Sequence, residues 1–509
     1  MKKQARPPTT NKPNSFHLIL SQVNIYVIFR TKECCMWDDT EAVTSIFTSI
    51  CSFIITVGLY LDMWDHTNLQ VESFFRFSHY VFYTGIGLTT VLLVSLWLLD
   101  KHRTKSFKFS LIGLTVFFLG VVGDSTWHIF WGFEDGIAGL ISPTHSLMFL
   151  GWSILSLSPI LAFWQQSKNL SLLRTGLVVA AVALGVACLK YILLYTHPLY
   201  HTSFNYFGLS STVLHTAFLA ITLIPLFNNF NLPFGSTPLI LILSEIGVIW
   251  LLDAYWFLPL AFLTGCLIDT YRETQYSSSL ITAGLVGLFY PASFILSASF
   301  FTPGSWPILP GIVTVLLSAT TTLFTIICLF NPLPNDLTVS KKSAVFLTLV
   351  ILNLSLVVLH PLSDSPEKFD FETDENFGVT NLILYSILMA SPLIWLVQGK
   401  PRTGEIFLLV FLGLLSHAIY FRSFVLGCVT LVSAIGIETV QPVKYVFKDE
   451  RGKTIYIVIS QLLLWPPLLL YSFYVHDTVW THYIWSGGIL LIAMITAGIT
   501  HVSNAVRRL

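Results

Sequence analysis

Long runs of apolar residues recur along the chain, from about residue 42 to residue 505, and constrain the fold more than any other feature. Each run has roughly 17–25 residues, which is the length that an α-helix needs to cross a bilayer. Apolar residues make up 54% of the 509 residues and charged residues only 11%, whereas soluble domains carry about 25% charge. The sequence therefore predicts an all-α, polytopic integral membrane protein, with the lipid bilayer as its first partner.

The apolar pattern divides into sixteen candidate transmembrane segments, although residues 237–270 and 404–440 are each too long for one span and short for two. We therefore expect about 14–16 membrane helices. The candidate segments are 42–62, 77–99, 108–130, 145–165, 172–195, 209–228, 237–251, 254–270, 279–301, 308–330, 342–361, 377–397, 404–420, 424–440, 454–474 and 483–505.

Basic residues predict the orientation, because cytoplasmic loops carry the excess of Lys and Arg. The basic clusters, such as residues 101–105 and 444–453, fall on one side if both long segments are hairpins or if neither is. We expect a multi-pass protein of the plasma membrane with both termini in the cytoplasm. The formal net charge is zero, so nucleic acid is not an expected partner.

The chain is expected to have three parts. Residues 1–35 form a basic, proline-containing N-terminal extension on the cytoplasmic side, and translation starting at Met36 would make it an over-extended gene start. The polar stretch at 228–235 breaks the apolar pattern and predicts a boundary. Residues 36–228 would then form a six-helix module and residues 236–509 a second helical bundle of unknown role.

Two similar arrays of Asp and His are the sequence's clearest candidates for chemistry. The first array is Asp62, His66 and His79 (Asp-x3-His-x12-His), and the second is Asp124, His128 and His145 (Asp-x3-His-x16-His). In each, the Asp and first His lie four residues apart near the end of one apolar segment, and therefore share a helix face. The second His opens the next segment. One carboxylate and two imidazoles suit copper, zinc or iron.

A less specific interpretation of these residues remains open. A lone His at a helix end is usually interfacial, and each array could be a hydrogen-bonded polar cap that stabilises its hairpin. The repetition in consecutive hairpins favours metal binding, because ionisable groups within membrane spans are costly and usually functional. In the expected orientation both arrays lie near the outer face.

The residues around both arrays resemble the C subunit of the particulate methane and ammonia monooxygenases. That family's first copper motif is also Asp-x3-His-x12-His with a Ser before the last His, as in residues 62–79. The second array, with Glu134, Pro143 and the pair Gly151-Trp152, resembles the family's order of Asn-x3-His, Glu, Pro-x-His and Gly-Trp. Here Asp124 replaces the family's Asn, and the connecting loop is three residues longer. The resemblance covers about residues 45–165.

The resemblance implies copper at Asp62, His66 and His79, and at Asp124, His128 and His145, in one shared site or two, with zinc as the alternative metal. Glu134 would orient a ligand, or is a solvated loop carboxylate. An oxygen-activating copper site could hydroxylate a small apolar molecule, so a copper-dependent monooxygenase component is the leading hypothesis. The family's other subunits would then be possible partners, as would further copies of this chain.

Two other classes of function compete with this one. A transporter or metal-handling permease would use the outer His and Asp residues together with Lys190 and Glu245. These two residues and Asp253 lie in or beside candidate spans. The structural alternative for these residues is helix–helix hydrogen bonding. A lipid-linked glycosyltransferase would use acidic residues of an early outer loop, but this class does not explain the recurrence of His with Asp.

Overall fold

The fold is seen in a computed structural model of the chain, which describes its residues in fifteen stretches. These are 40–68, 76–99, 104–132, 140–164, 170–200, 202, 205–274, 278–302, 306–330, 339–363, 371–399, 401–420, 424–446, 450–476 and 482–507. Within them the regular structure is helical throughout. The N-terminal extension 1–35 lies outside the described residues.

Each of the sixteen expected segments is a helix, so the all-α prediction is confirmed. The α-helices are α3 (Thr40–Asn68), α4 (Phe77–Leu98), α5 (Lys105–Trp131), α7 (Pro143–Phe163), α8 (Leu172–Ile192), α9 (Tyr206–Asn229), α10 (Ser236–Leu251), α11 (Leu258–Arg272), α12 (Ser279–Phe301), α13 (Ile308–Phe330), α14 (Val339–Ser363), α15 (Phe371–Gln398), α16 (Glu405–Tyr420), α17 (Phe424–Thr439), α18 (Val443–Val446), α19 (Glu450–His476) and α20 (His482–Arg507). Three 3-10 turns are η1 (Leu194–Thr196), η2 (Pro198–Tyr200) and η3 (Tyr255–Phe257).

Eleven of the described helices are long and apolar enough to cross a membrane. Their outward faces support this placement, because large apolar side chains point away from the protein along α4 and α5. Val91, Leu98 and Val122 are each more than 60% exposed. Such continuous apolar surfaces are rare on soluble proteins and are expected where lipid covers the helix. The protein is therefore membrane-embedded.

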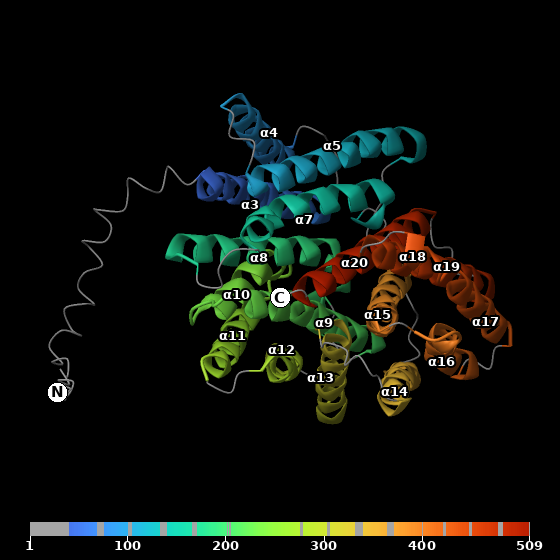
Figure 1. Ribbon diagram of the computed structural model, residues 1–509. Coiled ribbons are helices and arrows are strands. Elements are labelled where there is room, and N and C mark those ends of the chain that lie inside the picture. The colour runs from blue at the N-terminus through green and yellow to red at the C-terminus, as the bar shows by residue number, and fades with distance from the viewer. Residues whose placement is uncertain are drawn as a thin grey trace, which may run out of the picture.

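The N-terminal helices pack as two neighbouring hairpins, α3 with α4 and α5 with α7, shown in blue and cyan in Figure 1. Small residues let the backbones approach closely, as membrane helices commonly require. A Cβ atom on Gly151 of α7 would lie 2.3 Å from the backbone nitrogen of Phe117 on α5. Buried hydroxyls join α3 to both α5 and α7, since Ser45 contacts Ser106 and Ser52 contacts Ser156. These contacts hold α3, α5 and α7, which carry most of the array residues, against one another.

The two uncertain segments are both helical hairpins, α10–α11 and α16–α17. An acidic residue near the end of the second helix binds the start of the first, where backbone N–H groups lack intrahelical acceptors. Asp269 of α11 accepts from the backbone nitrogens of Gly235 (2.8 Å) and Thr237 (3.1 Å). Glu438 of α17 accepts in the same way from Gly404 (2.9 Å) and Phe407 (3.0 Å). The ends of each hairpin therefore meet on one side.

Contacts cross the expected boundary at 228–235. Helix α10 packs against α8 and also touches α3, and α20 returns from the C-terminal end of the chain to α7. Helix α9 lies against α12, α13 and α15 (Figure 1). One continuous apolar core runs from Ile55 to Ile499. The division into 36–228 and 236–509 stays a prediction about evolutionary or functional units.

Candidate metal centre

The second array sits where α5 ends and α7 begins. Asp124 and His128 lie in the last two turns of α5, which stops at Gly132, a residue with a left-handed φ of 82°. Ser142 caps the start of α7 and Pro143 follows it, as is common at the first helical position. This start places His145 in the first turn. Because α5 and α7 pack side by side, the three side chains meet.

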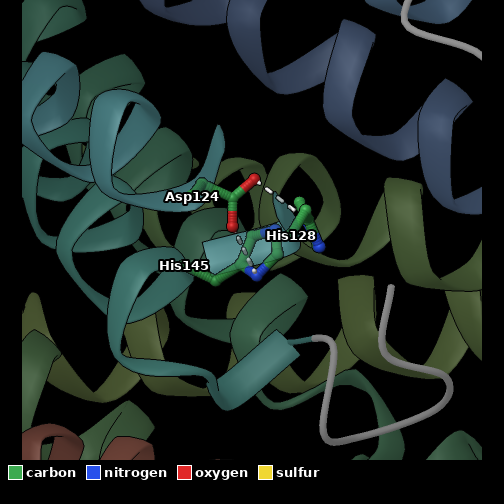
Figure 2. Close-up of side chains that lie close together, drawn as sticks. All are labelled: Asp124, His128 and His145. Atoms are coloured by element: carbon green, nitrogen blue, oxygen red, sulfur yellow. Dashed lines mark ion pairs between the residues drawn. The ribbon is translucent and has the colours of Figure 1, made fainter. Parts of the chain in front are cut away.

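Figure 2 shows the Asp124 carboxylate between the two imidazoles. Its Oδ2 lies 3.2 Å from Nε2 of His128, and its Oδ1 lies 3.5 Å from Nδ1 of His145. One donor atom from each of the three residues lies within 4.8 Å of the others. Among the residues that the structure describes, this is the only group of three His, Cys, Asp or Glu residues that is so compact.

The hydrogen bond on the far side of His128 determines which ring nitrogen is protonated. Its Nδ1 lies 2.9 Å from the carbonyl oxygen of Gly132. A carbonyl only accepts, so Nδ1 carries the proton and the neutral ring has a lone pair on Nε2. That lone pair faces the Asp124 carboxylate, so two acceptors confront each other unless a proton or a metal cation lies between them. The arrangement matches a metal-binding histidine, whose other nitrogen usually donates to a carbonyl or carboxylate.

Hydroxyl groups at the start of α7 hold the other two ligands. Thr144 donates to Oδ1 of Asp124 at 2.9 Å, and the Ser142 hydroxyl lies 2.7 Å from Nδ1 of His145. Neither residue was among the predicted ligands. Their position next to His145 in the sequence could have indicated them, because hydroxyls there can reach the ends of two helices. Both limit the freedom of the Asp124 and His145 side chains.

The first array is also assembled, but more loosely. Oδ1 of Asp62 lies 2.8 Å from Nε2 of His79, whereas Oδ2 lies 3.6 Å from Nε2 of His66. The side chain of His66 is 41% exposed. Ser78 donates to Asp65 at 2.6 Å and lies 3.3 Å from Asp62, so its proton points to Asp65, whereas Thr144 donates to the ligand carboxylate itself. The structure brings both predicted histidines to the Asp62 carboxylate, in a wider arrangement than at Asp124.

The two arrays are neighbours. Helix α4 contacts both α3 and α5, and the ring of its Tyr83 stacks on that of His79 with centroids 5.8 Å apart. Glu134, the expected orienting carboxylate, lies outside the described residues.

An apolar groove of about 700 Å³ lies between α3, α8 and α10. Tyr60 and Leu61 line it on α3, directly before Asp62, and Trp250 and Tyr255 line it from the α10 side. The other lining residues are mostly aliphatic, including Ala183 and Ala187 of α8. A small apolar molecule from the membrane would fit a space of this size and character.

Lys190 and Glu245 meet in the protein interior, as an ion pair between α8 and α10. Asp253, in contrast, is exposed at the turn after α10, with a positive φ of 52°. Tyr290 of α12 donates to Glu245 at 2.7 Å, a contact that could not be predicted because the two residues are 45 positions apart.

Comparison with known proteins gives no match. No protein-family model matches the chain, and no curated protein or solved structure is significantly similar to it. The resemblance to the monooxygenase C subunit therefore remains a prediction from residues 45–165.

Proposed function

We propose that the protein binds a transition-metal ion, copper in the first instance, between Asp124, His128 and His145. The observation that carries this proposal is the compactness of the group, with three donor atoms within 4.8 Å of one another. The protonation of His128 at Nδ1, inferred from its contact with Gly132, supports it because Nε2 is then a ligand atom. An imidazole–carboxylate set has the highest affinity for copper among the divalent metals, with zinc as the alternative.

We further propose that the metal works in oxidation of a small apolar molecule with O2. Three protein ligands leave a coordination position open, which a catalytic site needs and a structural site does not. When bound, copper would supply the electron transfer to oxygen. The chain's own residues would orient the ligands through Thr144 and Ser142 and admit an apolar substrate from the membrane. The groove between α3, α8 and α10 would hold such a substrate beside the first array, and its lining includes no residue of the Asp124 site.

The first array supports a second, weaker metal site. Its exposed His66 and the 3.6 Å separation from Asp62 make it the less preformed of the two. The orientation with both arrays near the outer face, and both termini in the cytoplasm, belongs to the same proposal. Labelling of single cysteines introduced near each terminus and between residues 133 and 139, from outside intact cells, tests it.

Elemental analysis of the purified protein in detergent tests the metal site directly. Wild type should carry copper after growth in copper-replete medium, and the variant Asp124→Ala/His128→Ala/His145→Ala should lose it. The variant Asp62→Ala/His66→Ala/His79→Ala should retain the ion at the second array. Zinc alone in the wild type would indicate a structural or hydrolytic site in place of an oxidising one. No metal in any of these proteins would refute the proposal. Oxygen consumption with small hydrocarbons or ammonia then tests the reaction.

A second candidate is a metal-handling permease. The observation that favours it is the buried Lys190–Glu245 pair within the helix bundle, because such pairs often line translocation paths. Reconstituted vesicles distinguish the two functions. A permease moves the metal across the bilayer without consuming oxygen, and Glu245→Gln should slow that flux while the ion bound at Asp124 remains.

A further inference from the structure

A buried polar cluster surrounds Glu245 in the protein interior, apart from both metal candidates. The Glu245 side chain is fully buried, and its Oε1 accepts hydrogen bonds from Lys190 of α8 and Tyr290 of α12. Its Oε2 lies 3.3 Å from Nε2 of His197, which sits between the turns η1 and η2. A single carboxylate thus joins two helices to the connection between α8 and α9.

His215 of α9 forms the other side of the cluster. Its ring packs edge-on against that of His197, with centroids 4.6 Å apart, and its Nε2 contacts the Thr196 hydroxyl at 3.3 Å. A cavity of about 10 Å³ lies between His215 and Lys190. This is close to the smallest space that holds one water molecule, and its walls are mostly apolar, with Lys190, His215 and Thr222 as the polar members.

The backbone fixes the protonation of His197. The N–H of Leu199 donates to Nδ1 of His197 at 3.2 Å, so Nδ1 has the lone pair and Nε2 has the proton. Nε2 therefore points its hydrogen towards Glu245, but among the described residues neither Nε2 nor Oε2 has a well-aligned partner, although both atoms are buried. A second proton on this ring can go only to Nδ1. There it would meet the Leu199 N–H, and the two donors would repel each other.

Whether His197 takes up this second proton depends on its burial and on the charges around it. Burial lowers the pKa of His197, Glu245 acts against that shift, and Lys190 adds to it. The titratable groups that face the ring among the described residues are Lys190, Glu245 and His215, with Tyr290 behind the carboxylate. Lys190 and Glu245 neutralise each other, so a proton on His197 adds one positive charge to an enclosed site. The ring is therefore neutral near pH 7 and gains its proton on acidification.

We propose that His197 is a proton-binding site, and that protonation of its Nδ1 releases Leu199 and opens the turns η1 and η2 over the cluster. The turns have three residues each, and their contacts outside the cluster include the Ser211 hydroxyl on the Thr196 carbonyl and the Tyr195–Tyr200 ring pair at 5.3 Å. The ligand is a proton, and the responding element is the segment 193–200. This inference is independent of the metal site, because none of the groups involved belongs to either array.

Hydrogen–deuterium exchange of the segment 193–200 tests the proposal. Rates are corrected for the intrinsic pH dependence of exchange and compared between pH 7 and about pH 5. Uptake of one proton on opening should raise the corrected exchange of wild type by up to about tenfold per pH unit. His197→Gln should abolish this rise, because glutamine can still accept from Leu199 and donate to Glu245 but binds no proton. His501→Gln, at an exposed position on α20, serves as the control.

The other outcomes decide against the proposal. An equal rise in wild type and His197→Gln, or no rise in wild type, overturns it. Loss of the rise in His215→Gln alone would place the proton on His215 and also overturn it. Nitrogen-15 NMR of histidine-labelled wild type gives a check that needs no variant. It should show one ring with the Nε2–H tautomer that gains a proton on Nδ1 in the same pH range, and absence of such a ring contradicts the assignment.

Discussion

The ion pair between Lys190 and Glu245 offers the sharpest test of the packing, because Lys190→Met removes the charge and keeps the length of the side chain. Lys190 is 5% exposed and Glu245 is fully buried. Removing one partner of a buried pair costs about 3–5 kcal/mol, since the other charge is left without compensation. The orphaned carboxylate can instead take up a proton, which costs about 3.7 kcal/mol at pH 7 for an ordinary glutamate.

We expect Lys190→Met to lower the free energy of unfolding by about 3 kcal/mol at pH 7. This is the low end of the range, because Tyr290 still donates to Glu245. The sign of the pH dependence follows from the bound proton. The folded variant binds one proton that the unfolded chain has released, so its stability falls as pH rises from about 4.5 to 7. The loss should therefore shrink by about 1.4 kcal/mol for each unit that pH is lowered.

Reversible unfolding in mixed micelles of a mild detergent and dodecyl sulfate measures these free energies. Lys453→Met is the matched control, because Lys453 is 31% exposed and pairs with Glu450 at 3.1 Å. It should cost less than about 1 kcal/mol. The double variant Lys190→Met/Glu245→Gln should recover most of the loss, and it serves as the pH reference. A loss of unfolding free energy under about 1 kcal/mol in Lys190→Met, or an equal loss at pH 7 and at about pH 4.5, would refute the argument.

Three further outcomes follow from the helix contacts. Thr144→Val removes the hydrogen bond to Asp124, so metal affinity in a competition titration should fall about 10–100-fold, and an unchanged affinity would contradict the assigned role. Gly151→Val places side-chain atoms against the backbone of α5, so the purified protein should lose both α5–α7 packing and metal, whereas Gly176→Ala in open space should change neither. Asp269→Ala removes the group that binds the start of α10 and should cost about 0.5–2 kcal/mol in the same unfolding assay.

The helices and the ligand pairs on single helices could be predicted because both depend on local spacing. Apolar runs of bilayer length form helices, since a backbone in lipid must satisfy its own hydrogen bonds. The four-residue spacing of Asp124 and His128 places both side chains on one face of any α-helix. The return of His145 to the same place required only a short connection between two antiparallel neighbours.

The cluster around Glu245 could not be predicted in full, because its members come from separate elements. Lys190 and Glu245 are conspicuous as charges in apolar segments, but nothing in the spacing pairs them. Tyr290 meets Glu245 only because α12 packs near α10, and His197 meets it through the path of the η1–η2 connection. The difference between the two metal candidates has the same origin. Their spacings are nearly alike, and the compactness at Asp124 depends on hydroxyls supplied by the start of α7.

The carboxylate at the base of each short hairpin bears on how the chain enters the membrane. Helix α10 is synthesised before α11, so its first N–H groups lack the Asp269 side chain that binds them in the finished protein. The same order separates α16 from Glu438. With 16 residues each, α10 and α16 are also short for a bilayer that needs about 20. Each short helix therefore completes its insertion only when its partner has been made, and the hairpin is the unit that the insertion machinery must accommodate.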